Sequence, residues 1–400
     1  MTPSRSALAR ALPLVVVLLA GLPAAAGAQQ LEFQGEPKLA FTDSDNSKIA
    51  QTRRVAITSV VLEFQTKVSA EEITGLLSKR VLNRHNTFSR NTLAGFDPAM
   101  LQQAADKVHE KLVADLTAAG FEVVPQAEVE AQAAYQKLVQ EMGWPQGYHW
   151  GNQDGNSILV APSKLKLYVP PVAEQGSFSN VRKESSPYQG PTVGFGDRMK
   201  LGGASSYSAG REVEIAKALN AHVLKAWYLV GFGQATAETD WDSKTTTITG
   251  GGFKSTTTTG ATQRTGATAQ MYLRDEQTRI ALRTPDGNTG YNRESSRKNA
   301  ITGGYRPWDG DVVVRLDETV FGVADFLKDG GVQKESKQDG ALATGLNVAA
   351  GLLSALGGRS GGLGDSSQSY TTQVDPAAFA QYSTELIGWV QPRLIQKLKP

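Results

Sequence analysis

The run 55–64, VAITSVVLEF, constrains the fold more than any other part of the chain. It is almost continuously apolar and rich in β-branched residues, without strict alternation of apolar and polar positions. Such a run is typical of a strand that is covered on both faces, as in sheets flanked by helices. The sequence therefore predicts a central buried strand within an α/β fold.

A helix is expected to follow this strand. Asp97 and Pro98 form a helix start, with Asp as the N-cap and Pro at the first helical position. Apolar residues then recur at helical spacing until Gly120, a typical residue just after a helix end. A short strand, 121–124, and a second helix, 127–142, are predicted next.

The second half of the chain is expected to return to the same sheet. The pattern predicts a short helix, 212–219, a long strand, 221–232, and a hairpin made of the strands 267–273 and 279–284. It then predicts a further strand, 312–316, a helix beginning near Asp317 and ending near Gly330, and a C-terminal helix, 376–400.

Two polar regions are read as loop insertions in this domain. Residues 143–210 are rich in Gly, Pro and Ser around a short strand-like run, 165–169. Residues 243–266 are rich in Thr and Gly, and Gly250–Gly252 would supply the turn of an extended hairpin. The fold class predicted is therefore α/β: a small mixed β-sheet with flanking helices, long loop insertions and a C-terminal helix.

The remaining segments are assigned by composition. Residues 53–330 would form the α/β domain, preceded by a flexible N-terminal segment, 29–52. A Gly/Ala/Ser-rich linker, 331–375, would lead to the C-terminal helix. Within it, residues 340–358 carry no charge and consist mainly of small residues. This segment is compatible with a membrane-active or self-associating helix, but also with a helix covering the core or a mobile loop.

The N-terminus has the features of an export signal. Arg5 and Arg10 precede an apolar stretch, 12–20, that is too short to span a bilayer as a helix. Ala26-Gly27-Ala28 is a small-x-small cleavage site, so residues 1–28 are expected to be removed. The chain has no Cys, and so no residue for lipid attachment at this site. The expected location is the bacterial periplasm or the outer membrane.

Charge and cysteine content exclude several classes of protein. The whole chain has 41 Lys and Arg against 39 Asp and Glu, and the leader holds two of the positive charges, so the mature chain is neutral at 39 against 39. A neutral exported chain is not expected to bind nucleic acid, which calls for a basic face. Without Cys there is no disulfide framework, thiolate metal site or Cys nucleophile.

The sequence yields no catalytic, cofactor or metal motif, and two groups of residues as speculative candidates. Trp144, Tyr148 and Trp150 lie close together and would suit a ligand-binding patch, or a loop that packs its aromatic rings on the core. Asp309 and Asp311 would suit acid/base chemistry or a cation, or simply a tight turn before the strand at 312.

The order of elements carries a resemblance to a known family. The quoted segments are Arg54–Ile57, Val113–Pro125, Glu214–Leu224 and the expected hairpin Met271–Ile280. This order resembles the curli-secretion CsgG family and the N-terminal domain of TolB, which share a β-α-β-α-β-β layout. The resemblance covers roughly 53–140 and 211–284. The Thr/Gly stretch lies near the position of the membrane-inserting hairpins of curli-type pores, but it lacks alternating large apolar residues.

These observations lead to an expected function. The chain would be an exported, non-enzymatic envelope protein that assembles with itself or with an envelope partner, with association with the outer membrane as one form. The resemblance implies no catalytic residues. Two alternatives stay open: a soluble exported hydrolase that uses carboxylates such as Asp309 and Asp311, and a periplasmic protein that binds a small ligand through Trp144, Tyr148 and Trp150.

Overall fold

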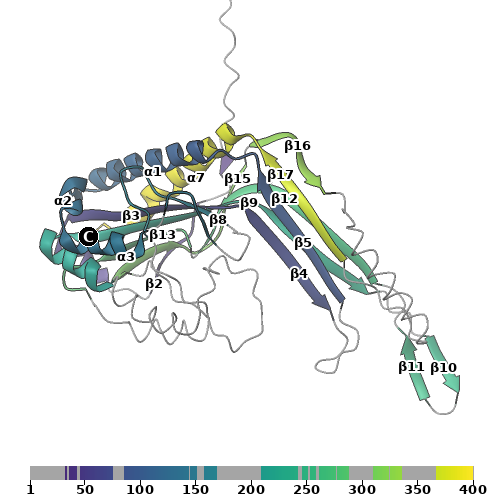
Figure 1. Cartoon of the computed structure of the whole chain (residues 1–400). Helices are drawn as coiled ribbons and strands as arrows, with labels where there is room; N and C mark the ends of the chain where they lie inside the picture. The colour runs from purple at the N-terminus through teal and green to yellow at the C-terminus, as the bar shows by residue number, and fades with distance from the viewer. Residues whose placement is uncertain are drawn as a thin grey trace, which may run out of the picture. The chain divides into compact units, whose positions relative to one another are not determined.

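The structure is a computed structural model in which residues 31–400 form one compact unit. It describes residues 32–33, 36–42, 46–74, 85–143, 145–150, 157–168, 209–241, 246–250, 253–257, 261–275, 277–287, 310–323, 325–335 and 366–399. Figure 1 shows a sheet flanked by helices, with further strands extending from it.

The centre of the main sheet is a pair of parallel strands, β3 (Arg54–Gln65) and β9 (His222–Trp241). Eleven residues of β3 are buried, and its apolar side chains contribute to core clusters on both faces of the sheet. The prediction of a strand covered on both faces is therefore confirmed. A short strand, β6 (Glu122–Val123), pairs with the start of β3 in parallel.

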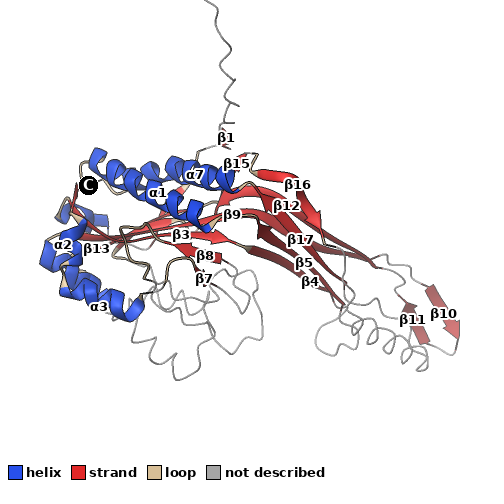
Figure 2. Cartoon of the chain, turned by 45° about the horizontal axis from the view of Figure 1, so that its top comes forward, coloured by secondary structure: helices blue, strands red, loops and turns tan. Residues whose placement is uncertain are grey.

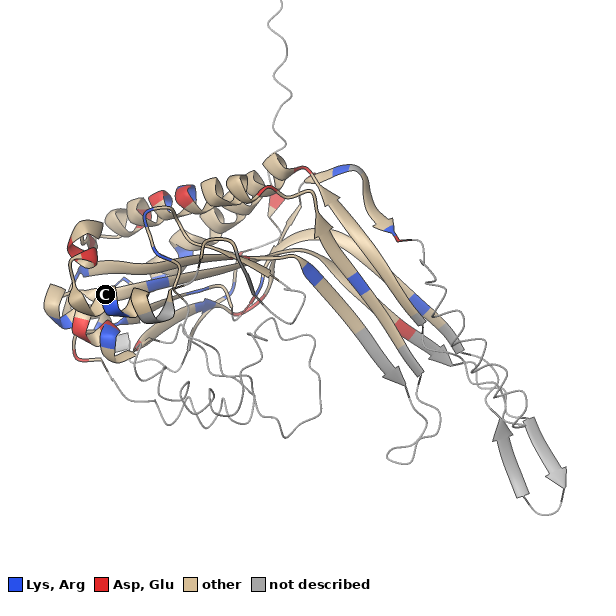
Figure 3. Cartoon of the chain, in the orientation of Figure 1, with Lys and Arg blue, Asp and Glu red and all other residues tan. Residues whose placement is uncertain are grey.

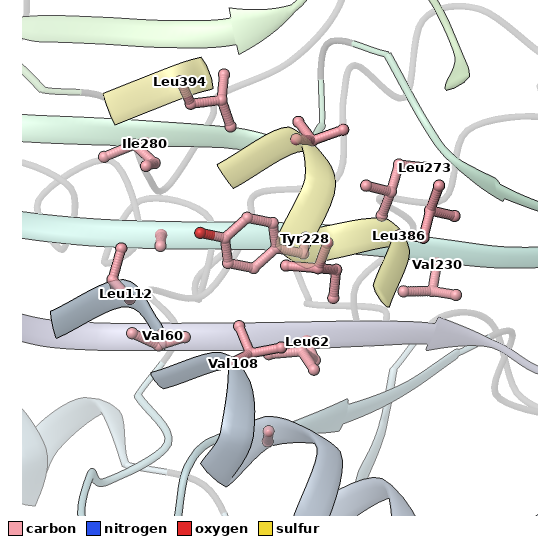
Figure 4. Close-up of a cluster of buried hydrophobic side chains, with 14 of the residues drawn as sticks. Val60, Leu62, Val108, Leu112, Tyr228, Val230, Leu273, Ile280, Leu386 and Leu394 are labelled. Carbon is pink, nitrogen blue, oxygen red and sulfur yellow. The ribbon is translucent and has the colours of Figure 1, made fainter. Parts of the chain in front are cut away.

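Helices cover both faces of this sheet. One face is covered by two long helices that pack against each other, α1 (Pro98–Ala118) and α7 (Pro376–Lys397); Figure 2 shows them side by side. Figure 4 shows their leucines meeting Val60, Leu62 and Tyr228 of the sheet. The smaller cluster on the other face is covered by α2 (Gln126–Glu130), α3 (Ala133–Met142) and the helix 209–219.

Local signals place the two long helices as the sequence predicts. The Asp97 carboxylate accepts a hydrogen bond from the Ala99 backbone N–H at 2.9 Å, and Pro98 occupies the first turn. Gly120, just past the end of α1, has φ 90°, a conformation that favours Gly. The Asp375 carboxylate caps α7 in the same way, through the Ala378 N–H at 2.8 Å.

The rest of the main sheet lies on both sides of β3 and β9. The remaining strands are β1 (Glu32–Phe33), β2 (Leu39–Thr42), β7 (Tyr148–Trp150), β8 (Ser157–Val160), β12 (Ala261–Leu273), β13 (Arg279–Arg283), β14 (Val312–Leu316) and β15 (Val320–Val323). With eleven strands the sheet is larger than expected, but the mixed α/β class and the C-terminal helix are confirmed.

The expected hairpin at 267–284 is wrong. β12 and β13 both pair antiparallel with β9, β12 with residues 230–241 and β13 with residues 223–227, so they lie in line rather than side by side. Between them, the Arg274 N–H binds the Leu229 carbonyl and the Thr278 N–H binds the Arg274 carbonyl. β13 therefore runs along β9 in the same direction as β12.

A second sheet of four strands lies against the part of β9 and β12 that extends beyond the helices. Its order is β16 (Leu327–Lys334), β17 (Ser366–Val374), β5 (His85–Ala94) and β4 (Lys67–Thr74). The Thr/Gly stretch also holds a two-stranded pair, β10 (Thr246–Gly250) and β11 (Phe253–Thr257). The hairpin predicted for this stretch is therefore present.

Five other expectations differ from the structure, three of them because long-range strand pairing outweighs local composition. Part of the segment expected to be flexible, 29–52, forms β1, β2 and the 3-10 helix η1 (Asn46–Gln51). The expected linker holds β17 and the end of β16, and the expected helix 317–330 holds β15 and the start of β16. Helix 127–142 is two helices, because Gln132 has an extended backbone between them. The described part of the run 165–169, residues 165–168, forms only an isolated bridge, between Tyr168 and Gly143.

Candidate functional site

Residues 233–241 of β9 and 261–269 of β12 pair with each other, and we call this pair the ribbon. The four-stranded sheet and the ribbon form two layers with a polar interior. The side chains of Ser89, Asn91 and Thr372 are fully buried there. Ser89 Oγ donates to the Gly266 carbonyl at 2.9 Å, and Asn91 Nδ2 donates to the Thr268 carbonyl at 3.4 Å. Thr372 Oγ1 in turn donates to Asn91 Oδ1 at 2.8 Å.

Small side chains let the two layers approach closely. Ala235, Ala237 and Ala267 of the ribbon are half-buried, whereas Gln234 and Thr236 are exposed. Tyr370 crosses the gap, and its hydroxyl donates to the Thr265 carbonyl at 2.9 Å. Hydrogen bonds to backbone carbonyls require a fixed register, so this interior specifies how the layers align.

The outermost strands of the four-stranded sheet are β4 and β16, and neither has a second strand partner in the described part of the chain. Edge strands can accept a strand from another molecule. β4 carries Lys67 with Glu71 and Glu72, for a net charge of −1, whereas β16 carries Lys328 and Lys334 with Asp329, for a net charge of +1. Figure 3 shows isolated Lys or Arg positions on the coloured parts of β4 and β5.

Strand direction and charge favour contact between unlike edges. β4 and β5 are antiparallel, β5 and β17 are parallel, and β17 and β16 are antiparallel, so β4 and β16 run in the same direction. β4 of one copy would therefore meet β16 of the next as a parallel pair of opposite net charge. Contact between two β4 edges would bring like charges together. A bulge at Gly330 and Gly331, both at positive φ, makes the β16 edge irregular.

A buried carboxyl group lies on the opposite side of the main sheet from α1 and α7. Glu63 of β3 is fully buried, and its Oε2 accepts a hydrogen bond from Trp227 Nε1 of β9 at 3.0 Å. Burial raises the pKa of Glu63 to about 7, although the indole hydrogen bond favours the ionised form. A carboxyl group that titrates near neutrality is a recognised feature of functional sites, and also of buried structural networks.

Gln65 lies two residues after Glu63 on β3 and forms a second buried polar contact on the same face of the sheet. Its Oε1 accepts a hydrogen bond from the Tyr272 hydroxyl at 2.6 Å. A Cβ on Gly231 would lie 2.0 Å from Cζ of Tyr272, so only Gly at this position lets the ring lie across β9. Burial raises the pKa of Tyr272, which keeps its hydroxyl a hydrogen-bond donor.

Asp311 belongs to a second buried polar network, at the start of β9. Glu212 is fully buried and pairs with Lys225 at 2.9 Å and with Arg283 at 3.4 Å. Asp311 lies 3.6 Å from the Arg283 guanidinium and accepts a hydrogen bond from the Thr284 N–H at 2.9 Å. This carboxylate therefore fixes the start of β14 against the end of β13, which is the role of a turn residue.

The other candidate residues are only partly described. Asp309 and Trp144 lie outside the described residues. Tyr148 and Trp150 lie on β7, which pairs with β8, and their side chains are outside the described part of the structure. The aromatic patch therefore remains a prediction. Sequence reasoning missed Glu63, because a single acidic residue inside an apolar run gives no signal of its own.

The N-terminal segment is fastened to α7 by a set of contacts that we call the clasp: Phe33, Glu36, Trp389 and Arg393. The rings of Phe33 and Trp389 are stacked, with centroids 4.4 Å apart and planes at 5°. The Arg393 guanidinium lies 4.5 Å from the Trp389 ring centroid and donates to both Glu36 oxygens, at 2.9 and 3.2 Å. The clasp therefore ties the first described strand to the last helix.

The described residues contain no group of three or more His, Asp or Glu side chains placed to hold a metal ion. None of the helices in the described ranges is both long and apolar enough to cross a membrane.

Comparison with known proteins adds no relative. No protein-family model, curated protein or solved structure matches this chain.

Proposed function

We propose that the chain is an exported, non-enzymatic envelope protein that assembles with itself, through contact between β4 of one copy and β16 of the next. The observation that carries the proposal is that β4 and β16, the edge strands of the four-stranded sheet among the described residues, run in the same direction and have opposite net charge. A contact between two different surfaces can repeat from one copy to the next, and it gives a ring when the rotation between neighbouring copies adds up to a full turn.

The core is compatible with the CsgG/TolB-like layout that the sequence resembles. β3 pairs in parallel with β6 and with β9, and α1 lies between β3 and β6 in the chain. The helix 209–219 immediately precedes β9. These features support the resemblance as far as β9, whereas the in-line arrangement of β12 and β13 departs from the hairpin that was expected.

The exposed side chains of the ribbon favour a position of the ribbon in water or at the membrane surface. The described side chains that face away from the four-stranded sheet include Gln234, Thr236, Glu238 and Thr268, all of them exposed and polar. Strands in contact with lipid carry an apolar row at these positions. We therefore place the protein in the periplasm or against the outer membrane, with a second copy or another envelope protein as its partner.

The mass of residues 29–400 in solution tests this proposal. Size exclusion with light scattering, with and without mild detergent, should give a discrete multiple of the single-chain mass in both buffers. A multiple seen only in detergent would support assembly at a membrane. A single-chain mass in both buffers, across a hundredfold range of concentration, would contradict self-assembly.

A further inference from the structure

A hollow lies between α1 and α3, which cover opposite faces of the main sheet, and no residue of β4 or β16 lines it. It has a volume of about 460 Å³ and is bounded by α1, the end of α3 and the segment that follows β8. Ligand sites commonly enclose about 300 to 1,000 Å³. Its lining consists of Gln102, Val139, Gly143, Gln146, Ser163, Leu165, Lys166 and Leu167.

Hydrogen bonds hold the walls of this hollow in place. Gln102 Nε2 donates to the Ala161 carbonyl at 2.8 Å, and Gln146 Oε1 accepts from the Ala161 N–H at 3.0 Å. The Ser163 N–H donates to Asp106 Oδ1 of α1 at 2.6 Å. The segment is therefore tied to α1 and to the turn after α3, and a ligand would not need to order it on binding.

The polar groups of the lining that are not used in these wall hydrogen bonds define which ligands the hollow could bind. Lys166 is the one charged residue of the lining, it is exposed, and it forms no ion pair within the described ranges. The Ser163 side chain is exposed beside it, and Gln102 keeps its amide oxygen as an acceptor. Leu165 and Leu167 are almost completely buried and Val139 is half-buried, so the apolar surface that the hollow exposes is small, although it exceeds the polar surface.

We propose that this hollow binds a small polyhydroxylated carboxylate, the chemical class of the sugar acids. The Lys166 ammonium would bind the carboxylate through charge-assisted hydrogen bonds. The Ser163 hydroxyl, which can donate and accept, and the Gln102 amide oxygen, which accepts, would bind the ligand hydroxyls. Gln146 instead holds the wall, because its Oε1 accepts from the Ala161 N–H and its Nε2 donates to the Leu165 carbonyl at 3.5 Å. A ligand with a large apolar body would gain little from so small an apolar area.

Calorimetric titration of mature residues 29–400 tests this site. The probes are glucuronate, galacturonate and gluconate, with glucose as the matched neutral sugar. We expect saturable binding of at least one acid, and at least tenfold weaker binding of glucose, because loss of one charge-assisted bond corresponds to about a tenfold change. Lys166→Gln should weaken binding of the acid to a similar extent.

Lys164→Gln is the control, because Lys164 is exposed two residues away and is absent from the lining. It should leave binding unchanged. Failure of all three acids to saturate would overturn the proposal, as would equal weakening by Lys164→Gln and Lys166→Gln. Neither lysine lies on β4 or β16, so the mass in solution should be the same for both variants and for the wild type, whatever the outcome of the titration.

Discussion

Glu63 and Trp227 are joined across the parallel strands β3 and β9 by a hydrogen bond of 3.0 Å, and both side chains are at most 2% exposed. The bond places an indole N–H, which can only donate, against a carboxyl group whose pKa burial raises to about 7. The pair therefore links the stability of the central sheet to pH in the neutral range.

Replacing Glu63 with Gln should change how stability depends on pH. The pKa of Glu63 is higher in the folded chain than its ordinary value of 4.5, so the folded state retains a proton that the unfolded state loses. Stability should therefore fall as pH rises from about 4.5 to 7, by about 3 kcal/mol if the whole shift is expressed. Glu63→Gln, which cannot ionise, should remove this fall.

Urea unfolding at pH 5 and pH 8 measures the effect. The variant should match the wild type at pH 5 and exceed it at pH 8. Glu110→Gln, on the exposed side of α1, is the matched control and should follow the wild type at both pH values. If wild type and Glu63→Gln show the same difference between the two pH values, the buried carboxyl does not control this dependence.

Trp389→Ala should release the N-terminal segment while leaving the core folded. The change removes the stacking on Phe33 and the contact with the Arg393 guanidinium, which together are worth about 1 to 2 kcal/mol. Limited proteolysis followed by mass spectrometry should then show faster cleavage between residues 29 and 45. Unchanged cleavage would mean that the pairing of β1 with β15 and of β2 with β14 holds the segment without the clasp.

Tyr228, Gln391 and Asp115 should behave as one network between the sheet and the two long helices. The Tyr228 hydroxyl donates to Gln391 Oε1 at 2.8 Å, and Gln391 Nε2 donates to Asp115 Oδ2 at 2.9 Å. Tyr228→Phe would leave a buried amide oxygen without this donor, at a cost of about 1 to 3 kcal/mol. A double-mutant cycle with Gln391→Leu should show a non-additive energy, and strict additivity would refute the coupling.

Gly231→Ala should disrupt the crossing of Tyr272 over β9. The added methyl group would overlap the tyrosine ring, so the expected loss of stability is about 1 to 3 kcal/mol or more. Gly210→Ala is the control, because a Cβ there meets nothing within 4 Å. Removing the ring in the double variant Gly231→Ala/Tyr272→Ala should make the loss of stability smaller than the sum of the losses of the two single variants. Equal melting temperatures for Gly231→Ala and Gly210→Ala would contradict this account.

Local signals were sufficient to predict the elements that depend on near neighbours. Asp97 and Pro98 begin α1 because the cap and its target N–H lie two residues apart. β17 was not predicted, because its Ser- and Thr-rich sequence becomes a strand only by pairing with β5, from Thr87 to Ala94, far away in the chain. Asp317 has the pattern of a helix cap, but its N–H binds the Lys38 carbonyl and the chain re-enters the sheet.

The candidate sites were harder to predict from the sequence than the helices and strands. Asp311 was found because acidic residues cluster before β14, but its pairing with Arg283 depends on strand register. The hollow beside Lys166 arises where segments from three parts of the chain meet, and none of its residues forms a motif. That β4 and β16 are edge strands in the described part of the chain follows only from the pairing of the strands in space, which the sequence does not give.

Mixing two charge-reversed chains tests the assembly contact most directly. One chain carries Glu71→Lys with Glu72→Lys on β4, and the other carries Lys328→Glu with Lys334→Glu on β16. Both variants should first show the melting temperature of the wild type. If the double variant on β4 does not, Glu71→Lys alone replaces it. By light scattering, each variant alone should have the single-chain mass, because its β4 and β16 edges now carry like charges. An equimolar mixture should recover the multiple seen for the wild type. A mixture that stays at the single-chain mass, or variants that assemble alone as the wild type does, would contradict contact between β4 and β16.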